Sequence, residues 1–148
     1  LKPLYNRALM SPYPPGSFFK IVQALIGLQE GVITPETAFV VGTSPMKDHV
    51  PGGVHNDLHA AIQWSSNTYF YHTFRRIILK EARGNPFVDA RLGYEKWREN
   101  VMTFGLGRTL GVDLPNEQKG IVKSLTYFDR VYGENRWKFS NIYSMSIG

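Results

Sequence analysis

Apolar side chains recur every three or four positions in several parts of the chain, which is the spacing of a helix with one buried face. The stretches with this pattern are residues 18–29, 58–64 and 68–82 and a region near 94–104. Gly31 stands just after the first stretch and predicts its end. Asn56 or Asp57 can cap the second stretch at its start. We therefore expect helices to dominate the chain.

The segments between these stretches favour loops and short extended pieces. Residues 42–56 are rich in glycine, proline and polar side chains, which predicts a long loop. Residues 33–39 predict a turn into an extended piece, and "VDLP" at 112–115 predicts another. From residue 119 onward the pattern assigns no element. Strands are expected to be few and short.

Composition indicates a packed body. Hydrophobic residues make up 43% of the 148 residues and aromatic residues 14%, which argues against disorder. The absence of cysteine excludes disulfides and thiolate chemistry. No run of about 18 apolar residues is present. Since the chain begins without methionine and stops within an apolar–polar pattern, we expect it to be a portion of a longer protein.

The net charge of +5 allows an anionic partner such as nucleic acid, lipid or an acidic polymer. The basic residues are scattered, however. The densest group, Arg75, Arg76 and Lys80, has helical spacing beside apolar residues, which favours a solvated helix face over a nucleic-acid patch. No alternation of aromatic and basic residues is present either. We expect no nucleic-acid partner.

A Ser-x-x-Lys spacing stands at the start of the first predicted helix, where "PYPPG" precedes Ser17 and Lys20 follows it. Residues three apart share one helix face, so the amine can approach the hydroxyl and act as its base. The apolar neighbours of Lys20 would lower its pKa. An ordinary capping serine with a surface lysine is the alternative. The spacing also occurs at Ser44 and Lys47, within a loop, so it is not specific by itself.

The sequence "SSN" at residues 65–67 lies between the second and third predicted helices. A polar turn that caps the next helix is one interpretation. The other is a second group of catalytic side chains, because Ser65-x-Asn67 follows the Ser-x-x-Lys pair in the same chain. The two interpretations stay open on the residues alone.

Four segments together resemble a known family. They are "PPGSFFK", "SSN", "FGLGRTLGVDLPNE" and "SMSIG", in this order along the chain. The sequence resembles the transpeptidase domain of penicillin-binding proteins, the serine D,D-transpeptidases related to serine β-lactamases. The residues of these segments are most similar to those of class B members of the elongation type, penicillin-binding protein 2. The resemblance covers nearly the whole chain.

The resemblance implies an α+β fold, with residues 1–148 as a partial transpeptidase domain: a mostly helical fragment that lacks most of the antiparallel sheet. It implies that Ser17 is the acylated nucleophile and Lys20 its base. It implies that Ser65 relays a proton to the leaving group and that Asn67 holds the amide backbone of the substrate. The backbone N–H of Ser17 would supply half of the oxyanion hole.

One departure from the family concerns its third motif, Lys-Thr-Gly or Lys-Ser-Gly. Neither tripeptide occurs, and Lys123-Ser124 is followed by Leu125. In the family, the strand with this motif supplies the second oxyanion N–H group. We therefore expect the 148-residue chain by itself to be inactive.

The function implied by the resemblance is cross-linking of peptidoglycan stem peptides, with penicillins acylating the same serine. A non-catalytic β-lactam sensor is the alternative. The parent protein would be anchored in the bacterial inner membrane, with a periplasmic catalytic domain and a membrane-embedded glycan polymerase as partner. No cofactor is expected.

Five residues within twelve positions are of types that bind zinc, namely Asp48, His49, His55, Asp57 and His59. This region resembles one that, in some elongation-type relatives, holds a zinc ion through Asp, His and a Cys of the second motif. Ser66 stands at the corresponding position, so a strong ligand is lacking. We expect solvated histidines and no bound metal.

Overall fold

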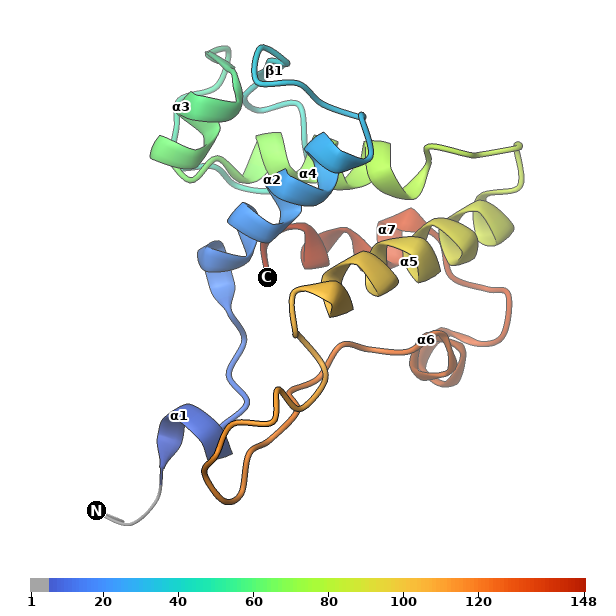
Figure 1. Cartoon of the computed structure of the whole chain (residues 1–148). Coiled ribbons are helices and arrows are strands. Elements are labelled where there is room, and N and C mark those ends of the chain that lie inside the picture. Colours follow the sequence, from blue (N-terminus) through green and yellow to red (C-terminus); the bar gives the residue numbers. More distant parts are fainter. Residues whose placement is uncertain (1–5) are drawn as a thin grey trace.

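The computed structural model describes residues 6–148, and helices dominate it (Figure 1). The α-helices are α1 (Arg7–Met10), α2 (Phe19–Gln29), α3 (Leu58–Gln63), α4 (Asn67–Ile78), α5 (Pro86–Thr103), α6 (Leu125–Tyr132) and α7 (Phe139–Ile142). Two 3-10 helices, η1 (Gly16–Phe18) and η2 (Tyr143–Ile147), precede α2 and follow α7. Strands β1 (Phe39–Val40) and β2 (His55–Asn56) pair antiparallel, with Phe39 opposite Asn56. These elements confirm a mostly helical chain with few strands.

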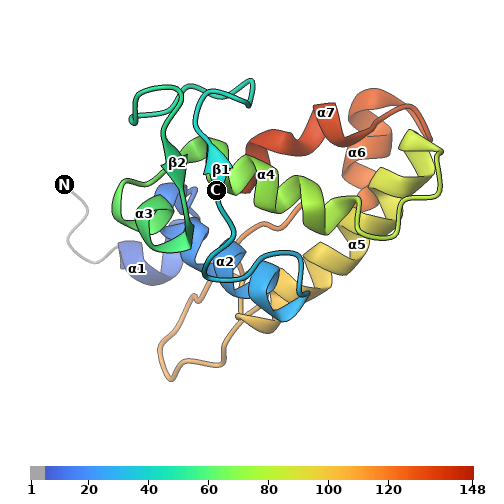
Figure 2. The same ribbon diagram turned by 90° about the horizontal axis from the view of Figure 1, so that it is seen from above.

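Helix α4 is central to the packing. It contacts α2, α3, α5, β1 and η2, and Figures 1 and 2 show it between α2 and the C-terminal helices. Phe70, Phe74 and Ile77 follow the spacing i, i+4, i+7 and are at most 6% exposed. Burial of each such side chain contributes about 1.5–3 kcal/mol. The apolar face of α4 therefore holds the surrounding helices together.

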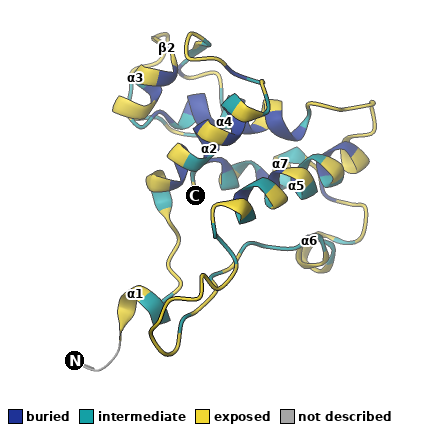
Figure 3. Cartoon of the chain, in the orientation of Figure 1, coloured by how far each residue is buried: buried dark blue, intermediate teal, exposed yellow. Residues whose placement is uncertain are grey.

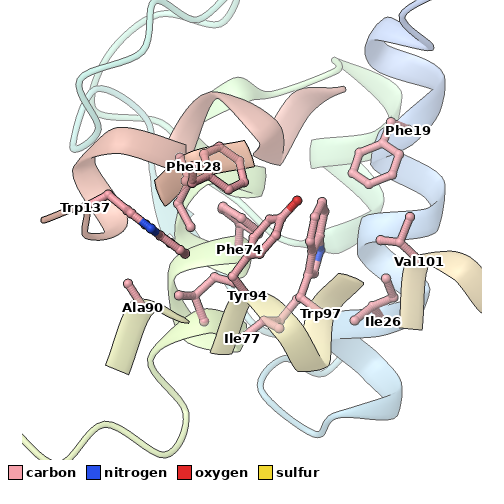
Figure 4. Close-up of a cluster of buried hydrophobic side chains, with 12 residues drawn as sticks. Phe19, Ile26, Phe74, Ile77, Ala90, Tyr94, Trp97, Val101, Phe128 and Trp137 are labelled. Carbon is pink, nitrogen blue, oxygen red and sulfur yellow. The ribbon is translucent and has the colours of Figure 1, made fainter. Parts of the chain in front are cut away.

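Trp97 of α5 joins three helices in the larger core cluster (Figure 4). Its ring meets Phe19 of α2 and Phe74 of α4 edge-on, at centroid distances of 5.8 and 5.0 Å. Its indole N–H donates a hydrogen bond to the buried Gln23 Oε1 at 2.8 Å. Such edge-on pairs stabilise by about 0.5–1.5 kcal/mol beyond the area that they bury. The start of α2 is thereby fixed against α5.

The same cluster extends to the C-terminal part of the chain. The ring of Tyr94 packs edge-on against Phe128 of α6, and the ring centroids of Phe128 and Trp137 are 5.1 Å apart. The Tyr94 hydroxyl donates to the carbonyl of Lys123 at 2.8 Å. Residues far apart in sequence are therefore joined across one continuous core.

A smaller buried cluster packs α3 against α2 and α4. Its members are Ala24, Ile33, Leu58, Ala61, Tyr69 and Phe70. Because α3 and α4 are adjacent in sequence, this cluster also fixes the short turn between them relative to the start of α2. That turn contains "SSN".

The first three helices predicted from periodicity are confirmed. Gly31 follows α2 with a φ of +66°, a conformation that glycine adopts without a Cβ penalty. Asp57, rather than Asn56, caps α3, because its carboxylate accepts from the Ala60 N–H at 2.8 Å. Helix α4 ends at Ile78, four residues before the predicted end at 82, because the chain turns at Leu79 and again at Gly84 toward α5.

The prediction of a helix near 94–104 was wrong at its start. Helix α5 begins at Pro86, eight residues before the predicted start at 94. Asn85 caps the helix by accepting from the N–H groups of Phe87 and Val88. Pro86 fits the first helical position because its missing N–H needs no partner there. Asn-Pro at this point starts the helix.

The C-terminal third of the chain departs most from the sequence pattern. Residues after 119 include α6, α7 and η2, to which the pattern assigned no element. No strand forms at 112–115 in the described structure, where Glu117 accepts from the backbone of Leu110 and Gly111 instead. The loop predicted at 42–56 ends earlier, because its last two residues form β2.

Helix α1 and the loop from 104 to 124 lie beside each other, away from the buried helices (Figures 1 and 3). The Gln118 N–H donates to the carbonyl of Leu9 at 2.8 Å and ties the two segments together. Figure 3 shows that both are largely exposed. Among the helices of residues 6–148, none has the length and apolar character needed to cross a membrane.

Candidate active site

Ser17 lies in η1, the first turn of the helical stretch that continues as α2. Gly16 has a φ of +57°, which turns the proline-rich segment sharply into the helix. The Ser17 side chain is exposed and forms no hydrogen bond with any residue from 6 to 148. The first N–H groups of a helix lack intrahelical acceptors and favour negative charge nearby. Ser17 is therefore accessible at a place suited to an oxyanion.

Lys20 lies one turn further along and is only 3% exposed. Its ammonium group donates to Ser65 Oγ at 2.9 Å, to the carbonyl of Ser65 at 2.6 Å and to Asn67 Oδ1 at 2.7 Å. An ammonium group has three donors, and all three have a partner here. Lys20 thus joins α2 to the turn between α3 and α4.

The electrostatics of Lys20 are dominated by burial. Removal from water disfavours the ammonium form and lowers the pKa of Lys20 to about 8, although the negative charge of Asp48 raises it in part. With that pKa, about one lysine in ten is a neutral amine at pH 7. The burial expected from the neighbouring residues is confirmed, and the amine is able to act as a base near neutral pH.

The turn at 65–67 places Ser65 by an unusual backbone conformation. Ser65 has a φ of +53°, in the left-handed region that few residues other than glycine adopt. The N–H groups of Ser65 and Ser66 donate back to the carbonyls of Ile62 and Ala61, which closes the C-terminus of α3 as a Schellman motif. This geometry directs both the hydroxyl and the carbonyl of Ser65 toward Lys20.

Asn67 is held at both ends of its side-chain amide. Its Oδ1 accepts from Lys20 Nζ, and its Nδ2 donates to the carbonyl of Lys47 at 2.7 Å. Because each end has a partner of the correct type, the orientation of the amide is fixed. Sequence analysis did not identify the contribution of the loop carbonyl, since a backbone acceptor leaves no mark in the residue pattern.

Three of the four predicted site residues, Lys20, Ser65 and Asn67, are therefore brought together. Ser17 precedes Lys20 by one turn of the same helical stretch, but no hydrogen bond joins their side chains within residues 6–148, so the approach of the amine to the hydroxyl stays a prediction. The alternative of a surface lysine is wrong, because Lys20 is buried. The alternative of a capping turn holds for Ser66, which caps α4 by accepting from the Tyr69 N–H.

The second Ser-x-x-Lys sequence has a different environment. Ser44 and Lys47 lie in the loop between β1 and β2, outside any helix, and the side chain of Lys47 is exposed. The spacing alone therefore does not create a buried lysine. The helix and the packed turn do so at Lys20.

The five candidate metal ligands have different environments and partners. His49, His55 and His59 are exposed, and Asp57 caps α3. Asp48 instead accepts hydrogen bonds from the 65–68 turn, a role that sequence analysis missed because it weighed this residue only as a zinc ligand. Over residues 6–148, no three histidine, aspartate or glutamate side chains form a group suited to a metal ion. The absence of a metal stays a prediction.

A cavity of about 580 Å³ lies beside the start of α2. It is bounded by the proline-rich segment, the glycine-rich loop after α5 and Gly148. Phe19 lines it, whereas Ser17, Lys20, Ser65 and Asn67 do not. The polar cluster around Lys20 therefore lies outside this cavity.

Comparison with known proteins gives a family match over almost the whole chain. Residues 1–147 match the family model described as "Penicillin binding protein transpeptidase domain". The peptidoglycan D,D-transpeptidase MrdA of Acinetobacter baumannii is 30% identical over 159 residues, which cover 99% of this chain and 21% of that protein. The chain thus spans about a fifth of the length of this curated relative.

Solved structures give the same result for the fold. PBP2 from Helicobacter pylori is 29% identical, with TM-scores of 0.75 alone and 0.74 in its complex with MreC, covering 99% of this chain and 26% of that chain. PBP2 from Pseudomonas aeruginosa, in complex with WCK 5153, is 28% identical with a TM-score of 0.69, covering 99% of this chain and 32% of that chain. The expected fold class is confirmed, as a mostly helical portion of this α+β fold.

Proposed function

The chain belongs to the penicillin-binding protein transpeptidase family, and from this we propose that the protein carrying it is a peptidoglycan D,D-transpeptidase. It would cross-link stem peptides through an acyl-enzyme on Ser17 and would be acylated there by penicillins. The similarity to MrdA and to PBP2 proteins supports this substrate class.

One observation carries the proposal for the site. A buried lysine with a pKa of about 8 is held by Ser65 and Asn67, one helical turn after an exposed serine. A serine nucleophile needs a base nearby and a site for the oxyanion. The helix start at Ser17 supplies backbone N–H groups for that charge.

The proposed reaction assigns one role to each residue. Ser17 Oγ attacks the penultimate D-Ala carbonyl as the neutral amine of Lys20 takes its proton. The tetrahedral intermediate collapses to an ester on Ser17, and the terminal D-Ala amine leaves with a proton relayed through Ser65. The amine of a second stem peptide then attacks the ester and releases Ser17. Asn67 holds the amide backbone of the substrate throughout.

We propose that residues 1–148 are a partial domain with low activity by itself. The sequence lacks Lys-Thr-Gly and Lys-Ser-Gly, so the second oxyanion donor of the family is not among its residues. In the intact protein, that donor would come from another part of the chain.

We also propose the setting of the intact protein. Similarity to MrdA and PBP2 supports a parent anchored in the inner membrane, with its catalytic domain in the periplasm. A membrane-embedded glycan polymerase would supply the glycan strands whose stem peptides the parent cross-links. The complex of the H. pylori relative with MreC supports a protein similar to MreC as a second partner of the parent.

The test is labelling of the full-length protein with a fluorescent penicillin. Ser17→Ala should abolish the label, because the ester cannot form without the hydroxyl. Ser44→Ala is the matched control, since it removes the serine of the other Ser-x-x-Lys sequence and should leave labelling unchanged. Label that persists on Ser17→Ala would refute the assignment. A protein that is labelled but forms no cross-linked product from stem peptides would be a β-lactam sensor.

A further inference from the structure

We propose that Asp48 is a positioning residue, an inference that rests on the proposed function. Its carboxylate fixes the 65–68 turn and thereby holds the two side chains that bind Lys20. Asp48 lies in the loop between β1 and β2 and forms no hydrogen bond with Ser17 or Lys20. It acts through the residues that do bind the lysine.

One oxygen of Asp48 accepts two hydrogen bonds from the turn. Oδ2 accepts from Ser66 Oγ at 2.8 Å and from the Thr68 N–H at 2.8 Å. Ser66 and Thr68 are both 0% exposed, so neither donor has water as a substitute partner. Because Ser65 and Asn67 are the neighbours of Ser66, this anchor also sets their positions.

The other oxygen keeps the carboxylate in place. Oδ1 accepts from the His49 N–H at 2.8 Å and from the Val50 N–H at 3.4 Å, within its own loop. Next to it, the carbonyl of Lys47 accepts from Asn67 Nδ2. The loop therefore holds the turn at two adjacent points, through Asp48 at Ser66 and Thr68 and through the Lys47 carbonyl at Asn67.

Charge gives Asp48 a second effect on the same lysine. Burial raises the pKa of Asp48, but hydrogen bonds from Thr68 and Ser66 outweigh it, so the pKa lies below its usual value and the group is ionised at neutral pH. Its negative charge raises the pKa of Lys20 against the effect of burial. The other groups around the ammonium are the uncharged Ser65, Asn67 and the ring of Phe70, 5.8 Å away.

An amide cannot replace this carboxylate. Each of the two oxygens accepts from at least one backbone N–H, so either orientation of an asparagine would turn its NH₂ group toward an N–H donor. Asp48→Asn therefore loses hydrogen bonds either to the turn or to the loop backbone that holds the carboxylate in place, and it removes the charge in the same change. Ser66→Ala removes one donor of the anchor and leaves the charge.

The experiment measures the acylation rate of the full-length protein by a fluorescent penicillin as a function of pH. Asp48→Asn should slow acylation by roughly 10- to 100-fold, the order of loss expected when a reacting group is misplaced by about an ångström. The acidic limb of its profile should also move to lower pH, because the pKa of Lys20 falls without the negative charge. Ser66→Ala should slow acylation and move the limb less than Asp48→Asn does, because the negative charge of Asp48 stays.

Glu134→Gln is the control, since this exposed carboxylate forms no hydrogen bond within residues 6–148 and should acylate like the wild type. Wild-type rate and pH profile in Asp48→Asn would overturn the proposal. If that variant does not fold, Ser66→Ala decides, because an unchanged acylation rate there would also overturn it.

A separate readout distinguishes this inference from the proposed function. The titration of Lys20 in protein with ¹³Cε-labelled lysine, followed by NMR, requires no acylation. If the wild type is not labelled by penicillin, the proposed function fails, and the anchor is still tested. Asp48→Asn removes a negative charge and also loosens Ser65 and Asn67, whose hydrogen bonds favour the ammonium form, so a lower Lys20 midpoint supports the proposal and an unchanged midpoint overturns it.

Discussion

At the scale of single residues, the burial of Lys20 sets the pH range in which the proposed reaction operates. Its pKa of about 8 means that the neutral amine is the minor form at pH 7 and the major form above 8. Acylation by penicillin should therefore rise about tenfold per pH unit below 8 and level off above it. The measurement is the acylation rate constant of the full-length protein from about pH 6 to 9.

An ordinary exposed lysine, with a pKa near 10.4, would keep the rate rising to the top of that range. A rate independent of pH would mean that Lys20 is not the base. Lys47→Met serves as the comparison, because this exposed lysine has the same spacing from a serine and its loss should not change the profile.

Sequence reasoning identified residue types well and their partners only in part. Ser17, Lys20, Ser65 and Asn67 were chosen from motif spacing, and the last three converge. The partnership of Asp48 with Ser66 was not predictable, because it joins a loop to a turn and depends on tertiary packing. A carboxylate in a loop has the same appearance in sequence whether it binds a metal, solvent or a buried N–H.

At the scale of helices, the crossing of α4 and α5 depends on Gly93. A Cβ at this position would lie 1.8 Å from the carbonyl oxygen of Ile78, a backbone atom that cannot rotate away. Gly93→Ala should therefore lower the free energy of unfolding by about 2 kcal/mol or more, despite the roughly 1 kcal/mol that alanine gains in helix propensity. Thermal unfolding of the protein carrying the chain measures the effect.

Gly27→Ala is the matched comparison within α2. The three atoms nearest to a Cβ there would be side-chain atoms of Thr73 and Ile33, at 2.8 to 3.0 Å, and these shift more easily than backbone. It should cost less than Gly93→Ala. Equal losses in the two variants would show that the backbone contact at Ile78 does not determine the crossing.

Helices with apolar positions that recur over several turns were predicted, and the start of α5 and the short helix α6 were not. Helices α2 and α4 show regular apolar spacing, whereas α5 begins at Asn85-Pro86, a pair that also begins turns. Helix α6 has only eight residues and Phe128 is its one buried side chain, so its apolar positions do not recur over enough turns to predict a helix. Its stability comes from the contact of Phe128 with Tyr94 and Trp137, which no local window contains.

At the scale of the whole molecule, the question is how much of the proposed site lies within these 148 residues. The proposed nucleophile Ser17, its proposed base Lys20 and the second motif are present, and the third motif is not. We expect the isolated chain to be acylated about 10²–10³-fold more slowly than the full-length protein, because one oxyanion donor is lost. Parallel labelling of both with a fluorescent penicillin measures this ratio, and comparable rates would show that the missing motif is dispensable for acylation.

The left-handed backbone at Ser65 limits which side chains this position accepts. Threonine offers the same hydroxyl, but a β-branched side chain is strongly disfavoured at a φ of +53°. Glycine and asparagine suit the backbone and lack the hydroxyl. Serine alone among common residues meets both demands, so the shape of a helix ending, and not only its chemistry, restricts this position to one amino acid.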